Sequence, residues 1–154
     1  MKANLFVVLA ASGLLLAGTA SAQEKKIKRS DLPPAVEKTV AAQSAGATIK
    51  GFSTEKENGQ TLYEAEMTVN GHSKDISMTE DGSIVEIEEQ VAFDSLSPEV
   101  KAGLQTKAGK GKILKVESLT KKGKLVAYEA KVDTNGKKSE VQVGPDGKPL
   151  DHEE

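Results

Sequence analysis

The chain has 154 residues and a formal net charge of −2 at pH 7, from 21 lysine and arginine and 23 aspartate and glutamate residues. It contains no cysteine, which excludes disulfides, thiol chemistry and cysteine-ligated metals. Aromatic residues make up 3% of the chain, so side chains that could stack on bases are scarce. Because the net charge is also negative, we expect no nucleic-acid partner.

The first 22 residues have the pattern of a secretory signal peptide. Lys2 precedes an apolar run from Leu5 to Ala17, and Ala20-Ser21-Ala22 forms a small-x-small cleavage signal. The apolar run, about 13 residues long, is shorter than a membrane-spanning helix requires. We therefore expect residues 1–22 to be removed, the mature protein to be periplasmic or secreted, and no stable insertion into a membrane.

A short basic segment follows the cleavage signal. Residues 23–30 include EKKIKR, from Glu24 to Arg29, and are expected to form a flexible arm before the first helix. A weak contact between this arm and anionic lipid head groups is an alternative, because each basic residue near such a surface contributes about 1 kcal/mol.

The rest of the sequence resembles itself. YEAEMTVNG begins at Tyr63, and the similar YEAKVDTNG begins at Tyr128. Residues of the first half match residues of the second half at a constant offset, which is shorter by one position upstream of an insertion near Lys122. The matched positions keep apolar, proline and glycine residues in step. They pair Leu32, Pro34, Val36, Val40, Ile49, Phe52 and Gly59 with Leu96, Pro98, Val100, Leu104, Ile113, Val116 and Gly123. This pattern predicts two repeats, residues 31–91 and 92–154.

Each repeat is predicted to begin with a helix and to continue as hairpins. Pro34 and Pro98 suit the first turn of a helix, and Ser97 is a ready N-cap. Asn-Gly and Asp-Gly dipeptides then separate runs of alternating polarity, which is typical of tight two-residue hairpins. A loop at Asn70-Gly71 would place Ala65 opposite Ile76 on the apolar side. The predicted fold class is α+β, with two tandem repeats that each pack one N-terminal helix on a four-stranded antiparallel sheet.

This order of motifs resembles the PepSY-like family of exported bacterial domains, and the tandem arrangement resembles beta-lactamase inhibitor protein-like (BLIP-like) exported proteins. The motifs are Leu32-Pro33-Pro34 with Val36, Tyr63-Glu64-Ala65, Asp81-Gly82, Tyr128-Glu129-Ala130 and Asp146-Gly147. The resemblance implies a non-catalytic module that binds or restrains another exported protein. It also implies that the contact is made by the sheet face that the helices leave free.

Residues that could support catalysis are few. The chain has two histidines: His72 follows a predicted hairpin turn, and His152 lies in the acidic C-terminal tail. A Ser-His-Asp arrangement needs a histidine held rigidly beside its nucleophile. The sequence has no glycine-rich phosphate loop and no histidine pair at metal-ligand spacing. We therefore expect no enzyme, no catalytic residue, no cofactor and no metal.

Acidic residues gather on the predicted free face of the first repeat. The register that buries Tyr63 and Ala65 turns Glu64, Glu66 and Asp75 toward that face, and the alternation of the strands adds Glu55, Glu86 and Glu88. Residues 31–91 hold 4 basic and 12 acidic residues, a net charge of −8, whereas residues 94–154 hold 12 and 10. Three interpretations stay open: a solvated acidic surface, charge complementarity with the lysines between Lys107 and Lys124 within the molecule or across a dimer, and a docking surface for a basic partner.

The function predicted from the sequence is that of an exported binding protein, a monomer or weak dimer, that modulates or inhibits another exported protein such as a protease or other hydrolase. The predicted contacts are five of these carboxylates and a residue at a hairpin tip: Glu64, Glu66, Asp75, Glu86, Glu88 and Asn70. The alternative is an envelope protein that binds a small ligand or a divalent cation with the same carboxylates.

Overall fold

The computed structural model describes residues 24–57, 59–152 and 154, so the predicted signal peptide lies outside the described residues. The strands are β1 (Lys25–Ile27), β2 (Thr48–Glu57), β3 (Gln60–Val69), β4 (His72–Met78), β5 (Ile84–Val91), β6 (Lys112–Lys121), β7 (Lys124–Thr134) and β8 (Lys137–Val143). The helices are α1 (Pro34–Gln43) and α2 (Pro98–Ala108), each preceded by a 3₁₀ turn, Arg29–Asp31 and Phe93–Ser95. Neither is long and apolar enough to cross a membrane, and the same holds for every helix in the described part of the chain.

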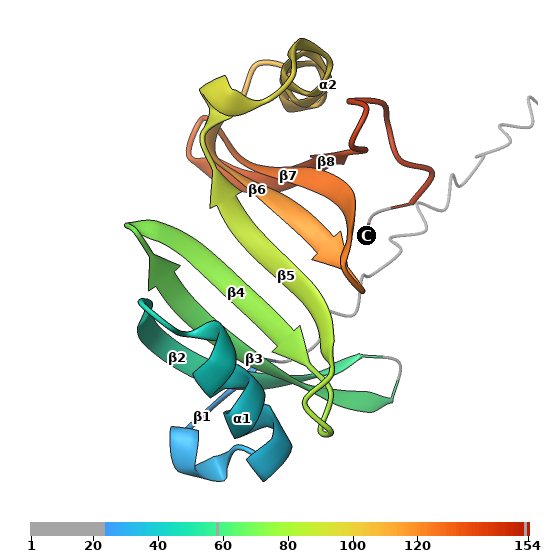
Figure 1. Ribbon diagram of the computed structural model, residues 1–154. Coiled ribbons are helices and arrows are strands. Elements are labelled where there is room, and N and C mark those ends of the chain that lie inside the picture. The colour runs from blue at the N-terminus through green and yellow to red at the C-terminus, as the bar shows by residue number, and fades with distance from the viewer. Residues whose placement is uncertain (1–23, 58, 153) are drawn as a thin grey trace, which may run out of the picture.

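The eight strands form one antiparallel sheet in the order of the sequence, from β1 to β8 (Figure 1). The predicted fold class, two tandem repeats that each pack one helix on a four-stranded sheet, is therefore wrong. The two halves join because β5 pairs with β4 on one side and with β6 on the other. After the Asp146-Gly147 turn the described chain adds no further strand. Pro149 follows there, and a proline cannot donate a hydrogen bond to a ladder.

Strand β5 also explains the role of β1. Ile27 of β1 pairs with Phe52, and Val91 at the end of β5 makes the corresponding pair with Val116, the residue that matches Phe52 in the second half. The end of β5 therefore pairs with β6 in the second half of the sheet as β1 pairs with β2 in the first half. The expectation of a flexible arm is wrong for Lys25–Ile27, because these residues pair with β2 and Ile27 packs against the first core.

The hairpin register predicted from the sequence is confirmed. Ala65 lies opposite Ile76 and Tyr63 opposite Met78, while Ala130 lies opposite Val141 in the second half. The turn between β3 and β4 has φ of 51° at Asn70 and 86° at Gly71, as a two-residue turn of this type requires. Because a slip of one residue would turn every core side chain outward, the apolar pattern and the turn fix the same register.

Both helices cover the same face of the sheet, each over its own apolar cluster. Pro34 and Pro98 begin the helices as predicted, and the Ser97 hydroxyl accepts a hydrogen bond from the Val100 amide at 3.2 Å. The first cluster contains Leu32, Val36, Val40, Phe52, Ala65, Met67, Ile76 and Met78; the second contains Leu96, Val100, Leu104, Val116, Ala130, Val132 and Val143. Full burial of each large aliphatic side chain stabilises the fold by about 1.5–3 kcal/mol. These positions include four of the pairs matched in the sequence: Leu32 with Leu96, Val36 with Val100, Val40 with Leu104 and Phe52 with Val116.

The Asp-Gly turns approach the helices closely. The Thr39 hydroxyl on α1 donates a hydrogen bond to the Gly82 carbonyl at 2.8 Å. Gly147, with φ of 77°, lies against α2 so closely that a Cβ atom there would clash with the Glu99 carbonyl oxygen. A glycine is therefore needed at position 147 for its backbone conformation and for its lack of a side chain.

We expect Gly147→Ala to lower the free energy of unfolding by about 3 kcal/mol, because it combines positive-φ strain with a clash against α2. Gly136→Ala is the matched control: Gly136 also has positive φ, 85°, but a Cβ atom there meets nothing within 4 Å. The control should lose about 1 kcal/mol from backbone strain alone. Urea unfolding of both variants measures the difference, and equal losses would contradict the close packing of this turn.

Candidate functional site

The sheet face opposite the two helices, called here the uncovered face, is concave. The helices lie at opposite ends of the molecule, with the two halves of the sheet between them (Figure 1). Six side chains on the uncovered face are buried although no helix covers them: Ser53, Leu62, Glu117, Leu119, Ala127 and Gln142. A flat face would leave such side chains in water, so neighbouring strands must bend enough for their side chains to cover one another. A hollow of about 120 Å³, lined in part by Leu62 and Glu86, lies on this face.

Three carboxylates form a continuous row across the middle of the uncovered face. Glu66 on β3 pairs with Asp75 on β4, and Asp75 pairs with Glu88 on β5. We call Glu66, Asp75 and Glu88 the carboxylate row. Like charges directly opposite each other destabilise a sheet by about 0.2–1 kcal/mol per pair. None of the ion pairs formed by the described residues includes a member of this row.

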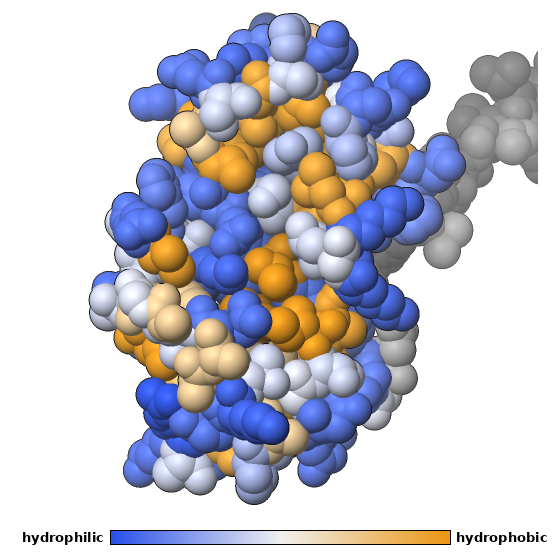
Figure 2. Space-filling model, viewed as in Figure 1, coloured by the Kyte–Doolittle hydropathy of each residue, from blue (hydrophilic) through white to orange (hydrophobic). Residues whose placement is uncertain are grey.

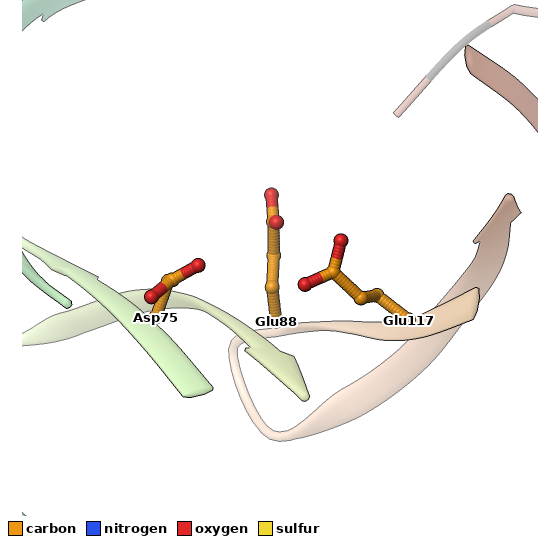
Figure 3. A group of neighbouring side chains, drawn as sticks. All are labelled: Asp75, Glu88 and Glu117. Atoms are coloured by element: carbon orange, nitrogen blue, oxygen red, sulfur yellow. The ribbon is translucent and has the colours of Figure 1, made fainter. Parts of the chain in front are cut away.

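The row continues toward a buried carboxylate on β6. Figure 3 shows Asp75, Glu88 and Glu117 rising from their strands on the same side of the sheet. Each of the three offers a carboxylate oxygen, and these oxygens lie within 4.8 Å of one another. The register thus brings together acidic groups from three strands, which concentrates negative charge at the centre of the face.

Glu117 differs from the row because lysines surround it. Its side chain is 1% exposed, and its Oε1 forms an ion pair with Lys115 Nζ at 2.5 Å. Lys131 Nζ lies 3.8 Å from the other oxygen, Oε2. The Ser73 hydroxyl on β4 donates a hydrogen bond to Oε1 at 3.2 Å and accepts one from Lys115 Nζ at 3.1 Å. We call these four residues the Glu117 clamp, because they connect β4 to β6 across β5.

Several carboxylates on this face have less compensation, and partial burial raises their pKa values. Burial, reinforced by the charges of Glu86, Glu129, Glu117 and Asp75, raises the pKa of Glu88 to about 8. Burial also raises the pKa of Glu64 to about 7, although the Ser53 hydroxyl donates a hydrogen bond to it at 3.1 Å. The pKa of Asp75 rises through burial and the neighbouring Glu117. The face therefore carries fewer charges at neutral pH than its composition indicates.

The structure brings most of the predicted contact residues together. Glu64, Glu66, Asp75, Glu86 and Glu88 all lie on the uncovered face, but each is half-buried, whereas the sequence predicted exposed side chains. Glu86 forms an ion pair with Lys121 at 3.2 Å. Asn70 lies at the exposed β3–β4 turn, outside the carboxylate row. Whether these residues contact a partner stays a prediction.

Two acidic residues of the face were missed by the sequence analysis. In the alignment of the two halves, Glu117 takes the place of Ser53, and Glu129 takes the place of Glu64. The same offsets that revealed the internal similarity would have placed both on the uncovered face. The interpretation of charge complementarity within the molecule holds in part, because Lys115 and Lys121 pair with Glu117 and Glu86.

A pocket of about 590 Å³ lies beside the C-terminal end of α2. Phe93, Ile113 and Leu114 line part of it, and so does Lys115 of the Glu117 clamp. Leu114 is 48% exposed. Hydrophilic side chains dominate much of the visible surface, with apolar patches between the two ends of the molecule (Figure 2). The lining of the pocket contains no histidine and one carboxylate, Asp94.

No protein-family model matches the sequence, and no relative among curated proteins matches it. Among solved structures, a protein assigned to the periplasm of Bacteroides eggerthii is similar with a TM-score of 0.61 and 16% identity, over 76% of this chain and 84% of that one. A BLIP-like protein from Bacteroides fragilis gives a TM-score of 0.55 and 18% identity, over 75% and 81%. A DUF2874 family protein from Bacteroides ovatus gives 0.57 and 20%, over 75% and 82%.

The chain shares their fold. At these identities the similarity extends to the fold alone. The predicted resemblance to BLIP-like proteins agrees with the Bacteroides fragilis structure, whereas the PepSY-like assignment stays a prediction because no family model matches. The predicted location, periplasmic or secreted, agrees with the periplasmic assignment of the Bacteroides eggerthii protein.

The Glu117 clamp gives a test of the charge balance on this face. Lys115→Met leaves Glu117 buried with Lys131 as its remaining cation, so we expect the free energy of unfolding to fall by about 2–3 kcal/mol. The double variant Lys115→Met/Glu117→Met removes both charges and should recover most of that loss. Lys148→Met is the control, since Lys148 is 80% exposed in its ion pair with Asp146, and should change stability by less than about 1 kcal/mol. Failure of the double variant to recover stability would contradict this account.

The pH dependence of stability tests the raised pKa of Glu88. Because this pKa is about 8 in the folded protein and about 4.3 in an unfolded chain, the folded state binds the proton more tightly. The proton on Glu88 makes its full contribution to the free energy of unfolding below about pH 4, and this contribution is lost as the pH rises toward 8. We expect Glu88→Gln to raise the free energy of unfolding by about 3 kcal/mol at pH 8.5 and to change it little at pH 4.

Glu89→Gln is the matched control for this measurement. Glu89 is the next residue on β5, but its side chain is 50% exposed and pairs with Lys74 at 2.9 Å. The control should change stability by less than about 1 kcal/mol at either pH. Chemical unfolding between pH 4 and 9 gives both curves, and a Glu88→Gln curve parallel to that of the parent protein would show that Glu88 does not titrate in this range.

Proposed function

We propose that this protein is a non-catalytic binding protein, exported to the periplasm or beyond, whose uncovered face takes a lysine- or arginine-bearing segment of another exported protein. The carboxylate row carries the proposal. It places Glu66, Asp75 and Glu88 side by side, and none of the three forms an ion pair with a described residue. A cationic segment of a partner supplies the missing charge and removes the repulsion between neighbouring strands.

The concave shape supports a protein segment as the occupant. The carboxylates lie on β3, β4 and β5, near the middle of an eight-stranded sheet, so a loop that enters the concavity reaches several of them at once. Negative potential in a concave site also speeds the approach of a positively charged partner. The modulation or inhibition of an exported hydrolase is a finer form of this proposal. It is supported by the BLIP-like description of one protein with the same fold.

A divalent cation fits the same carboxylates less well. Glu117 is the third carboxylate near Asp75 and Glu88, but its two oxygens already face Lys115 and Lys131. A metal ion bound there would lie beside two ammonium groups, and oxygen ligands that it needs would have to leave their lysines. The Glu117 clamp therefore favours an organic cation that approaches the row itself.

The surroundings of the histidines support a non-catalytic role. His72 lies at the start of β4 and His152 near the C-terminus, and both are exposed. His152 faces Glu154 at 3.9 Å, and no hydrogen bond of the described residues joins either histidine to a serine or threonine hydroxyl. Neither is therefore held as the general base of a nucleophilic mechanism.

Capture combined with zero-length cross-linking tests the proposal. A carbodiimide joins a carboxylate directly to an amine in contact with it, so treatment of the mature chain in envelope extract should link Asp75 or Glu88 to a lysine of the partner. The variant Asp75→Asn/Glu88→Gln should reduce the yield of this cross-linked species at least tenfold, since both side chains keep their shape and lose their charge.

The variant Glu80→Gln/Asp94→Asn is the control, with the same change of charge at two exposed positions outside the uncovered face. It should retain the cross-linked partner. Cross-links that form only through the helices or the exposed turns would overturn the assignment of the face. A rise in melting temperature with millimolar Ca²⁺ or Mg²⁺, abolished in Asp75→Asn/Glu88→Gln and without any cross-linked partner, would favour the divalent-cation alternative.

A further inference from the structure

Charge on the uncovered face is balanced unevenly, and the imbalance is largest at the carboxylate row. Thirteen titratable groups lie around the row and the Glu117 clamp: Glu55 from β2, Glu64 and Glu66 from β3, Asp75 from β4, Glu86 and Glu88 from β5, Lys115, Glu117 and Lys121 from β6, Glu129 and Lys131 from β7, Glu140 from β8, and Glu154 near the C-terminus. Three of these thirteen groups are cationic, and all three form ion pairs with carboxylates. The register also places Lys26, Glu57, Lys112, Asp133 and Lys138 on this side of the sheet.

The three lysines form their ion pairs with carboxylates outside the row. Lys115 and Lys131 pair with Glu117, and Lys131 also contacts Glu140 at 3.3 Å. Lys121 lies between Glu86 at 3.2 Å and Glu154 at 3.8 Å. On its β2 side the row meets Gly51, where a Cβ atom would be 3.7 Å from a Glu66 oxygen, so this side offers no side chain at all. No described residue therefore forms an ion pair with the row, although the charges of Lys115 and Lys131 offset part of the rise in the pKa of Asp75.

Carboxylates placed in this way do not all ionise together at neutral pH. Neighbouring strands are about 4.8 Å apart, and two carboxylates that share such a site have one pKa raised strongly. Partial burial acts in the same direction, because it disfavours the charged form. The protein can relieve the repulsion in two ways: it can retain a proton, or it can receive a cation from outside.

We infer that the carboxylate row retains a proton at neutral pH while the face is empty, and that this proton leaves for the solvent when a cationic group docks. The second half of this inference rests on the proposed function. Occupation of the face by a lysine or arginine side chain then exchanges one positive charge for another. Binding is consequently coupled to pH, and the face holds a cationic segment more tightly as the pH rises. The raised pKa values of Glu88 and Asp75 agree with the direction of this coupling.

The first part of the test uses the empty protein. Carbon NMR of the side-chain carboxyl groups, followed from pH 4 to 9 in the mature chain, should show at least one carboxyl of the row titrating above pH 6. In Glu88→Gln this titration above pH 6 should disappear, or it should be seen at Asp75 instead, because Asp75 and Glu88 share the proton. If every carboxyl of the row is fully ionised by pH 6, the inference is wrong, while the proposed function stands.

The second part uses pentalysine as the probe, with binding measured by calorimetry at pH 7 in two buffers that differ in ionisation enthalpy. We expect up to one proton to be released for each pentalysine bound, and the affinity to rise by up to about tenfold per pH unit below the pKa of the row. Glu80→Gln/Asp94→Asn should release the same number of protons, and Asp75→Asn/Glu88→Gln should release fewer.

The possible results separate the two proposals. Binding of pentalysine to the row without proton release would overturn the coupling and leave the docking face intact. A row that titrates near neutrality but binds no pentalysine at any pH from 6 to 9 would overturn both the cationic occupant and its coupling to the proton. Binding that is equally strong in Asp75→Asn/Glu88→Gln would show that the peptide occupies another surface, which contradicts both.

Discussion

The buried charge of Glu117 is the constraint on which the uncovered face depends. A carboxylate that is 1% exposed must be compensated, and Lys115, Lys131 and the Ser73 hydroxyl provide that compensation from three different strands. Because Ser73 is on β4 and Glu117 on β6, their hydrogen bond spans β5 and requires both side chains to lean inward. The clamp thus joins the two halves of the sheet at their junction and supports the concave shape.

The clamp also decides which carboxylates remain uncompensated. It takes up Lys115 and Lys131, and Glu86 takes up Lys121. The negative charge that is left over is concentrated where Asp75 and Glu88 lie side by side on neighbouring strands. The acidic centre is therefore a consequence of how the lysines are distributed by the register, and the number of acidic residues in the chain does not determine it.

The sequence predicted those features that depend on local pattern. The apolar alternation and the Asn70-Gly71 turn fixed the register of β3 and β4, and Ser97 capped α2 as expected. It did not predict the continuous sheet, since only long-range pairing shows that β5 serves both halves. The partial burial of the carboxylates was missed for the same reason. Alternation tells on which side of a strand a residue lies, but the bend of the whole sheet determines how much water reaches it.

Retention of an unfavourable row needs a reason, because replacing one acid by a neutral isostere would stabilise the sheet. In sequences that fold well, local propensity, apolar pattern, packing and charge usually favour the same structure, and the places where they conflict are most often functional. The second half of the molecule supplies a comparison: Lys131 and Glu140 occupy the positions that match Glu66 and Asp75, and they attract each other at 3.3 Å. The same fold thus accommodates an attractive pair at this site. The repulsive pair in the first half is not imposed by the architecture, which makes a role in binding a cation its simplest physical explanation.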